Sequence, residues 1–209
     1  MASGTFYPGV SGDDAECSAF DASKDWVTIG YDASNPKDVS CRFPSVTIPP
    51  GSTINSAYLH AFTYTERTGT VYSNIYANDV DNAVAPTSEP EFNALVKTTA
   101  FVAWDTLSVS NPQGYEHVSP DIAAVIQEVI DRTGWSSGNA LQIIWEDDGS
   151  AKFAYRMISS FDYDSGNYKM ELHIDWTAPV SVYDVCTWNP DDRGTNVSLD
   201  ATLLIASHD

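Results

Sequence analysis

The sequence predicts an all-β fold: an antiparallel, jelly-roll-like β-sandwich with one capping α-helix at about residues 119–133. Three observations lead to this prediction. Short runs of alternating or continuous apolar residues recur along the chain, turn-forming residues separate them, and only one segment has the spacing of an amphipathic helix. We therefore expect many short strands and a helix that covers one end of the core.

The strand-like segments follow one another with turns between them. Pro50 and Gly51 supply one turn, and "DDGSA" and "YDSGN" supply two later ones. The segments with a strand pattern are 25–31, 40–48, 53–66, 70–79, 100–105, 140–147, 152–162 and 168–176. Residues 80–99, which contain two prolines, predict a long irregular connection instead.

The long segment 53–66 alternates along its length. One face carries Ile54, Ser56, Tyr58, His60, Phe62 and Tyr64, and the other carries Ala57, Leu59 and Ala61. Only "RTG" separates this segment from segment 70–79, so we expect the two to form a hairpin.

The helix is predicted by signals at both of its ends. Ser119 is the expected N-cap, Pro120 suits the first turn, and Gly134 suits a left-handed stop. The apolar stripe with helical spacing consists of Ile122, Val125, Ile126, Val129 and Ile130. This stripe predicts a helix that packs against the core.

The polar face of this helix carries two carboxylates, Glu128 and Asp131, three residues apart. In a hydrolase, one carboxylate of such a pair could act as general acid and the other as general base. A solvated face on a core-packed helix is the simpler interpretation. The chain has no nucleophile elbow, phosphate-binding loop or zinc-protease motif, and we expect no enzyme activity and no catalytic residue.

The net charge narrows the choice of partners. The chain of 209 residues has 29 acidic against 10 basic side chains, a formal net charge of −19. Such a surface repels the phosphates of nucleic acids, and no apolar run is long enough to cross a bilayer. We therefore expect neither a nucleic acid nor a membrane as a partner.

The N-terminus leaves two possibilities open: a secretory signal has been removed, or the protein is made in a cytoplasm and leaves the cell another way, as a phage component does at lysis. The first residues have neither the positive charge nor the apolar stretch of a secretory signal. Cys17, Cys41 and Cys186 are odd in number and widely spaced, which argues against a zinc ribbon. We expect the cysteines to be free buried thiols, because a cytoplasm keeps thiols reduced. The alternative is a Cys17–Cys41 disulfide between neighbouring strands.

Oxygen-rich turns are the candidates for a metal site. We expect no cofactor, with calcium as the one exception. The candidate ligands are Asp79, Asp81, Asp147 and Asp148. The turn at 162–167 begins like a calcium loop, but the twelfth position holds His173 where a glutamate is needed. The four histidines are scattered, so we expect no histidine metal site.

Aromatic side chains are the candidates for binding a host-surface glycan by stacking. They are Tyr58, Tyr64, Tyr72 and Tyr76. The predicted hairpin would bring their segments side by side, and an exposed row of rings can stack on sugars.

Three stretches resemble one family. "RFPSVTIPPGSTINSAYLHAF" is similar to the strand–turn–strand signature of the DNRLRE-type β-sandwich superfamily, "SPDIAAVIQEVIDRTGWSSGNALQIIW" to its helix and next strand, and "AYRMISSFD" to a strand near its end. The resemblance covers roughly Trp26 to Trp176. It implies a sandwich like those of carbohydrate-binding modules, found in non-catalytic modules of bacterial surface and secreted proteins and in phage structural proteins.

The C-terminal residues 178–209 are predicted to be a linker and a strand. "TWNPDDRGTNVSLDATLLIAS" resembles the opening of a SPRY-like domain as it occurs in phage proteins. A single strand with one apolar face needs a partner, so we expect contact with another chain. The residues expected at this contact are Val197, Leu199, Leu203, Leu204 and Ile205. Residues 1–20 are predicted to be an extension and residues 21–177 the sandwich.

Together these features predict a non-enzymatic structural protein of a phage virion: a capsid decoration, head-fibre or tail-associated protein on the particle surface. Its expected partners are other virion proteins and copies of itself, and its expected location is the virion, assembled in the host cytoplasm. The alternative is a carbohydrate-binding module of a bacterial secreted or cell-surface protein. A virion protein should assemble in many copies, whereas a module should bind glycan as a monomer.

Overall fold

A computed structural model describes residues 1–17, 23–65, 67–107, 109–179, 197–199 and 206–208. The chain divides into two units, Met1–Pro179 and Val180–Asp209. This division lies two residues after the end that the sequence predicts for the sandwich.

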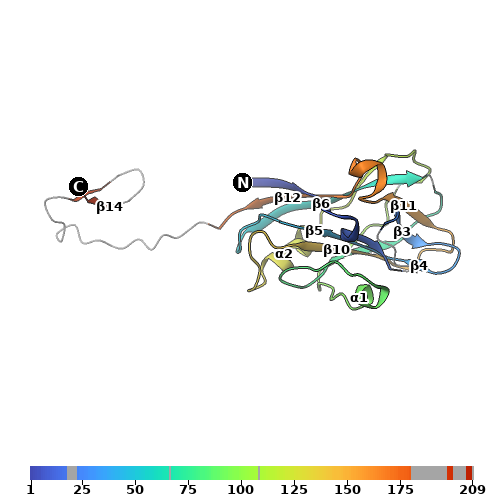
Figure 1. Ribbon diagram of the computed structural model, residues 1–209, viewed down its shortest axis with the longest axis horizontal. Coiled ribbons are helices and arrows are strands. Elements are labelled where there is room, and N and C mark those ends of the chain that lie inside the picture. The colour runs from blue at the N-terminus through green and yellow to red at the C-terminus, as the bar shows by residue number, and fades with distance from the viewer. Residues whose placement is uncertain (18–22, 66, 108, 180–196, 200–205, 209) are drawn as a thin grey trace. The chain divides into compact units, whose positions relative to one another are not determined.

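The first unit is an antiparallel β-sandwich, as predicted (Figure 1). One sheet has the order β1 (Ala2–Phe6), β12 (Glu171–Thr177), β6 (Thr53–Thr65), β11 (Tyr155–Ser159), β3 (Trp26–Tyr31) and β4 (Pro36–Lys37), with β9 (Glu116–Val118) paired to β6. The other has the order β2 (Asp14–Glu16), β5 (Val39–Phe43), β10 (Leu141–Asp147), β7 (Ser73–Ala77) and β8 (Val102–Ala103). The helices are α1 (Glu89–Asn93), α2 (Ala123–Ile130) and the 3-10 turns η1 (Ser11–Asp13) and η2 (Tyr163–Gly166).

The core lies between the two sheets and includes one face of α2. Trp104 and Trp145 stack within it, with ring centroids 4.6 Å apart, and Trp135 donates its indole N–H to a backbone carbonyl at 3.0 Å. A buried indole adds apolar area at no polar cost when its N–H is satisfied. These three tryptophans and Trp176 are buried, whereas Trp26 is only half-buried. Among the described residues, no helix has the length and apolar character needed to cross a membrane.

Strand β6 shows the predicted alternation over most of its length. Leu59 and Ala61 are buried, whereas Tyr58 is only half-buried. Ile54 departs from the pattern and is buried, because the pairing of β6 with β12 shifts register next to it. A shift of one residue moves a side chain to the opposite face, so the prediction that Ile54 shares a face with Tyr58 is wrong.

The hairpin predicted between residues 53–66 and 70–79 does not form. Strand β6 pairs with β12, β11 and β9, whereas β7 pairs with β10 and β8 in the other sheet. The connection crosses between the sheets, and its Gly69 carbonyl accepts a hydrogen bond of 2.7 Å from the buried guanidinium of Arg156. A buried charge requires such acceptors, which a tight hairpin turn would direct to solvent.

The predicted N-terminal extension belongs to the sandwich. Strand β1 pairs with β12 over five residues, and β2 pairs with β5. Phe6 is buried against Trp176, with ring centroids 6.5 Å apart. Cys41 on β5 is buried, Cys17 is half-buried, and both are free thiols, as predicted; Cys186 lies outside the described residues.

The second unit contains a short ladder in place of the single predicted strand. Strand β13 (Val197–Leu199) pairs antiparallel with β14 (Ala206–His208). Leu203, Leu204 and Ile205, which we expected at a contact between chains, lie outside the described residues.

Helix α2 is shorter than predicted at both ends. Its first turn begins at Ala123 rather than at Ser119, whose hydroxyl instead accepts the Leu59 N–H of β6 at 2.9 Å. Gly134 does not adopt the left-handed conformation. A side chain on Gly134 would collide with the carboxylate of Asp81, which would have to move from its position beside Arg132. The apolar stripe is confirmed, because all five of its residues are buried.

The segment at 119–127 covers an edge of β6 that none of the described strands pairs. Ser119, Asp121 and Gln127 each accept one backbone N–H of β6, at 2.9, 3.0 and 2.7 Å. Unpaired strand edges expose polar groups, and side-chain acceptors satisfy them here. Helix α2 is therefore a cover for the sheet edge and the core.

Candidate functional site

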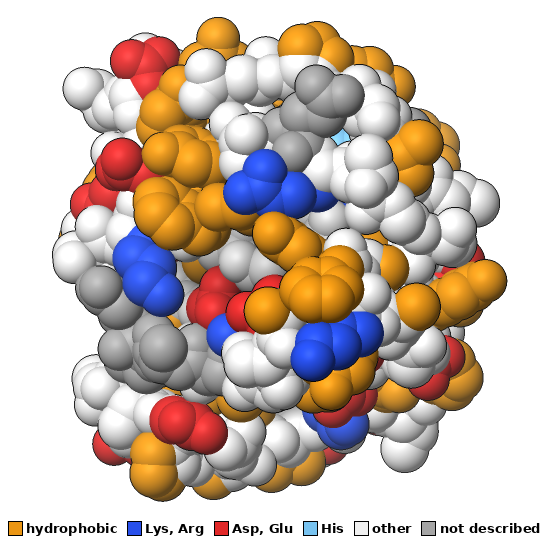
Figure 2. Space-filling view, turned by 90° about the vertical axis from the view of Figure 1, so that its right-hand side faces the viewer, with side chains coloured by type: hydrophobic (Ala, Val, Ile, Leu, Met, Phe, Trp, Pro, Cys, Tyr) orange, Lys and Arg blue, Asp and Glu red, His pale blue; other side chains and the backbone are white. Residues whose placement is uncertain are grey.

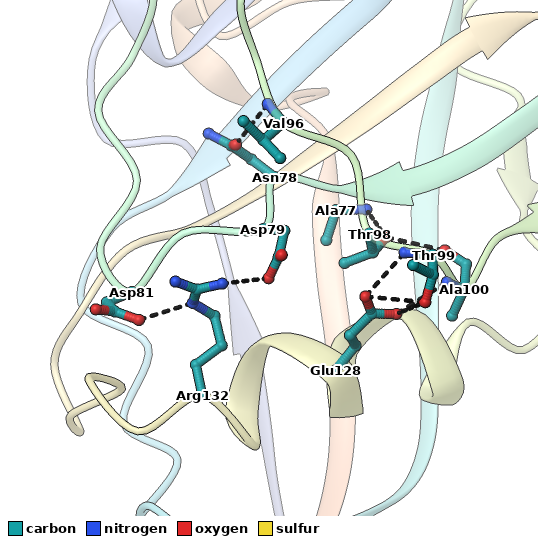
Figure 3. Close-up of polar contacts among 10 residues, drawn as sticks. All are labelled: Ala77, Asn78, Asp79, Asp81, Val96, Thr98, Thr99, Ala100, Glu128 and Arg132. Carbon is teal, nitrogen blue, oxygen red and sulfur yellow. Dashed lines mark hydrogen bonds and ion pairs between the residues drawn. The ribbon is translucent and has the colours of Figure 1, made fainter.

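The carboxylates on the polar face of α2 bind the protein's own backbone. Glu128 accepts the N–H groups of Thr99 and Ala100, each at 2.8 Å, and the Thr99 hydroxyl (Figure 3). Partial burial alone would raise the pKa of Glu128, but these hydrogen bonds outweigh it and lower the pKa below its ordinary value. Asp131 accepts from Gln127 at 2.7 Å. The two carboxylates have separate structural partners, which argues against their use as a catalytic pair.

Two of the calcium candidates pair with an arginine. Arg132 donates to Asp79 and Asp81 from two of its guanidinium nitrogens, the second at 2.7 Å (Figure 3). Asp147 lies at the other end of the β7–β10 ladder, where it accepts the Ser150 N–H. The four predicted ligands thus form two separate pairs, because Asp148 adjoins Asp147. The described part of the chain contains no cluster of three or more His, Cys, Asp or Glu side chains arranged to hold a metal ion.

The four candidate tyrosines do not form one platform. Tyr58 and Tyr64 lie on β6, whereas Tyr76 lies on β7 in the other sheet and Tyr72 directly precedes that strand. The ring of Tyr64 stacks on Trp26 at 5.0 Å, and Tyr76 packs under the ammonium group of Lys97 at 4.9 Å. Tyr58 has neither a ring partner nor a hydrogen bond among the described residues, so its ring remains available.

Tyr58 lies in a groove of about 550 Å³ on the outward face of the larger sheet. Three adjacent strands, β1, β12 and β6, supply the walls of this outer-sheet groove. Its lining residues are Ser3, Gly4, Thr5, Ser56, Tyr58, His60, His173, Ile174 and Asp175. A volume of several hundred Å³ is typical of a site for a small ligand.

Polar groups are arranged around the ring of Tyr58. His60 and His173 stack on each other, with ring centroids 3.9 Å apart. His60 Nδ1 hydrogen-bonds Glu116 at 2.6 Å, and His173 Nε2 hydrogen-bonds Glu171 at 2.7 Å, which fixes both rings. Each imidazole keeps its second nitrogen for another partner. The groove therefore combines one aromatic face with side chains that donate and accept hydrogen bonds.

The strand register places these groups together. Across the ladders, Thr5, His173 and Tyr58 form one row, and Ser3, Asp175 and Ser56 form the next. Residues directly opposite each other on one sheet face are neighbours. The sequence pattern marks Tyr58 as a candidate but not the other residues of the groove, although the alternation at 171, 173 and 175 matches that at 56, 58 and 60. The pairing of the two strands was the missing information.

Two carboxyls with raised pKa values, the buried Asp14 and the half-buried Asp38, lie outside the groove. Burial raises the pKa of Asp14 to about 7, opposed by a hydrogen bond from the Phe161 N–H, while the charges of Asp162 and Asp13 raise it further. Burial likewise raises the pKa of Asp38 to about 6. Perturbed carboxyls often mark catalytic sites. Asp14 is only 1 % exposed, however, so it is closed to a substrate and acts on stability instead.

One end of the sandwich gathers apolar and cationic side chains around a hollow (Figure 2). Phe153 and Lys152 are exposed in the loop before β11, and Phe153 has a left-handed φ of +71°. Lys37 forms ion pairs with two carboxylates, and the Arg67 guanidinium lies 5.3 Å from the ring of Tyr155. Lys37 and Arg67 therefore already interact with side chains of the same chain.

Comparison with known proteins adds no relative: no protein-family model matches the chain, and no curated protein matches it.

Proposed function

We propose that this chain is a non-enzymatic recognition module whose outer-sheet groove binds an uncharged, polyhydroxylated ligand, a neutral glycan. The observation that carries the proposal is the free ring of Tyr58 between His60, His173 and Asp175 in that groove. A sugar ring offers an apolar face for stacking and hydroxyl groups that both donate and accept. The groove has partners for each.

The charges in and around the groove favour a neutral ligand over an acidic one. The described residues that line it include no Lys or Arg, while Asp175 lies in it and Glu116 and Glu171 adjoin it through the histidines. A sugar that carries a carboxylate or sulfate would meet negative charge without a matching cation. The structural engagement of Glu128 and Asp131 supports the absence of catalysis.

The test is a binding assay with neutral oligosaccharides of different hexose linkages, measured by calorimetry and by NMR titration. We expect saturable binding by the full chain and no release of reducing ends. Tyr58→Ala should weaken binding by about tenfold, which corresponds to about 1.4 kcal/mol of stacking energy. Tyr58→Phe should bind nearly as well as the wild type, because it keeps the ring.

Tyr72→Ala is the matched control. Tyr72 is 45 % exposed and belongs to the other side of the sandwich, so its loss should leave binding unchanged. If no neutral oligosaccharide binds, or if Tyr72→Ala and Tyr58→Ala weaken binding equally, the groove is not the site and this function must be abandoned.

A virion structural role is the second proposed function, and the sequence motifs favour it. Residues 187–207 resemble the opening of a domain found in phage proteins, and the sandwich resembles modules used in phage particles. In this role the chain is a capsid decoration, head-fibre or tail-associated protein, assembled in the host cytoplasm together with other virion proteins and copies of itself. A glycan groove on such a protein would contact the host surface.

Mass spectrometry of purified particles tests this role. The chain should be present in a fixed number of copies per particle and should remain after washing with high salt. Its absence from particles made in cells that express it would exclude the virion role and leave the alternative of a bacterial surface module.

A further inference from the structure

Strand β1 forms an open edge of the larger sheet. It pairs with β12 on one side, and no described residue hydrogen-bonds the backbone of Ala2–Phe6 on the other. The terminal strands β4, β2 and β8 are only two, three and two residues long, whereas β1 has five. An open strand of this length is a template for a further strand.

Within the part of the chain that the structure describes, the β1 edge carries none of the devices that usually protect an edge. Strand β1 contains no Lys, no Pro and no register shift. Its Ser3 and Thr5 side chains are exposed and neutral. The first charged side chain of the sequence is Asp13, although the whole chain carries a net charge of −19. Two acidic molecules can therefore approach each other here with little local repulsion between side chains.

The sequence of β1 is complementary to itself in antiparallel orientation. Pairing about Gly4 sets Ser3 opposite Thr5 on the outward face and Ala2 opposite Phe6 on the inward face. Small hydroxyl side chains opposite each other form favourable cross-strand pairs. Self-pairing also has the two-fold symmetry of most homodimers, in which one patch contacts its own copy.

We propose that two copies of the chain associate through antiparallel β1–β1 pairing, which joins their larger sheets into one continuous sheet. Ser3, Gly4 and Thr5 also line the outer-sheet groove. The pairing places the grooves of the two copies next to each other on the same face. If the groove binds glycan, as proposed above, the dimer presents two adjacent subsites to one extended chain.

Sedimentation velocity of the full chain over a range of concentrations tests the association at low and high salt. We expect a monomer–dimer equilibrium that shifts toward dimer at high salt, because salt screens the repulsion between two chains of charge −19. Hydrogen exchange of those β1 amides that do not bond to β12 should slow as the dimer becomes populated. A monomer at every concentration in both salts would overturn the proposal.

A paired variant and its control locate the interface. Ser3→Lys with Thr5→Lys places like charges across the two-fold axis and should weaken dimerisation at least tenfold. Val10→Lys with Val84→Lys adds the same charge at exposed positions outside β1 and should not weaken it. Circular dichroism and the melting temperature should show that both variants fold.

Two further results would count against the interface. A dimer that withstands Ser3→Lys with Thr5→Lys uses another surface. Slow exchange, in dilute monomer, of the β1 amides that do not bond to β12 would mean that another part of the same chain covers the edge. Neither result depends on sugar, so a failure of glycan binding is distinguishable from a failure of β1 pairing.

Discussion

Replacing Asp14 by Asn should stabilise the protein at neutral and alkaline pH. Asp14 is buried, and its pKa is raised to about 7 from the value of 3.8 for a solvated Asp. Below pH 3.8 the carboxyl is protonated in both the folded and the unfolded state, so it contributes no pH dependence there. As the pH rises toward 7 the unfolded chain ionises first, and the folded state loses stability until the pKa of the folded state is passed.

The magnitude follows from the size of this shift. About three pKa units at about 1.4 kcal/mol each give a loss of about 4 kcal/mol above pH 7, an upper value because the site can relax on ionisation. Asn has nearly the same shape, keeps an oxygen to accept the Phe161 N–H and carries no charge. Asp14→Asn should therefore restore most of the stability that the wild type loses above pH 7.

The assay is urea unfolding of both proteins at pH 4 and at pH 8, with the slope m compared to confirm two-state behaviour. Asp14→Asn should be more stable than the wild type at pH 8, and the two should nearly coincide at pH 4. Asp148→Asn, at an exposed position, is the control and should change little at either pH. Equal stabilities at pH 8, or a difference independent of pH, would refute the reasoning.

Three further outcomes concern helix α2 and its surroundings. Glu128→Ala should cost about 1 kcal/mol in urea unfolding, more than the expected effect for a solvated residue, because two backbone N–H groups lose their acceptor. The pKa of Glu128 is lowered in the folded state, so its contribution to the free energy of unfolding should be fully present above pH 4.5. This contribution should disappear as the pH falls through the pKa of the folded state. If Glu128→Ala destabilises the protein equally at low pH, the explanation is wrong. Ile126→Asp should unfold the domain or cost several kcal/mol, seen as loss of the melting transition, because it buries an unpaired charge. Gly134→Ala should lower the melting temperature by displacing Asp81, and combining it with Asp81→Ala should recover part of the loss.

Local patterns were predictable from the sequence. The faces of β6 and the buried stripe of α2 follow from side-chain periodicity, which depends only on near neighbours in the chain. The residue at which helix α2 begins was not predictable in the same way. Ser119 has the chemistry of an N-cap, but the edge of β6 competes for its hydroxyl and binds it.

Strand pairing and the candidate site were harder to predict. The short "RTG" link suggested a hairpin, but the partner of β6 is β12, more than a hundred residues away. The groove is built from three strands that are remote in sequence, and His60 and His173 become neighbours only through their register. No local signal in one sequence specifies that register. Glu128 was expected in solvent, because the residues it binds belong to a connection without a repeating pattern.

The pairing of β1 with β12 affects how the protein is made. Strand β1 is synthesised before the other strands of its unit, and β12 is the last strand described in that unit. Contacts of such long sequence separation close late and slow the folding of β-rich proteins. On the ribosome, β1 must wait for almost the entire domain to emerge before its partner exists. The edge of β6 that receives β12, and with it the groove, stays incomplete during that interval, so a nascent chain is exposed to mispairing until residue 177 has left the exit tunnel.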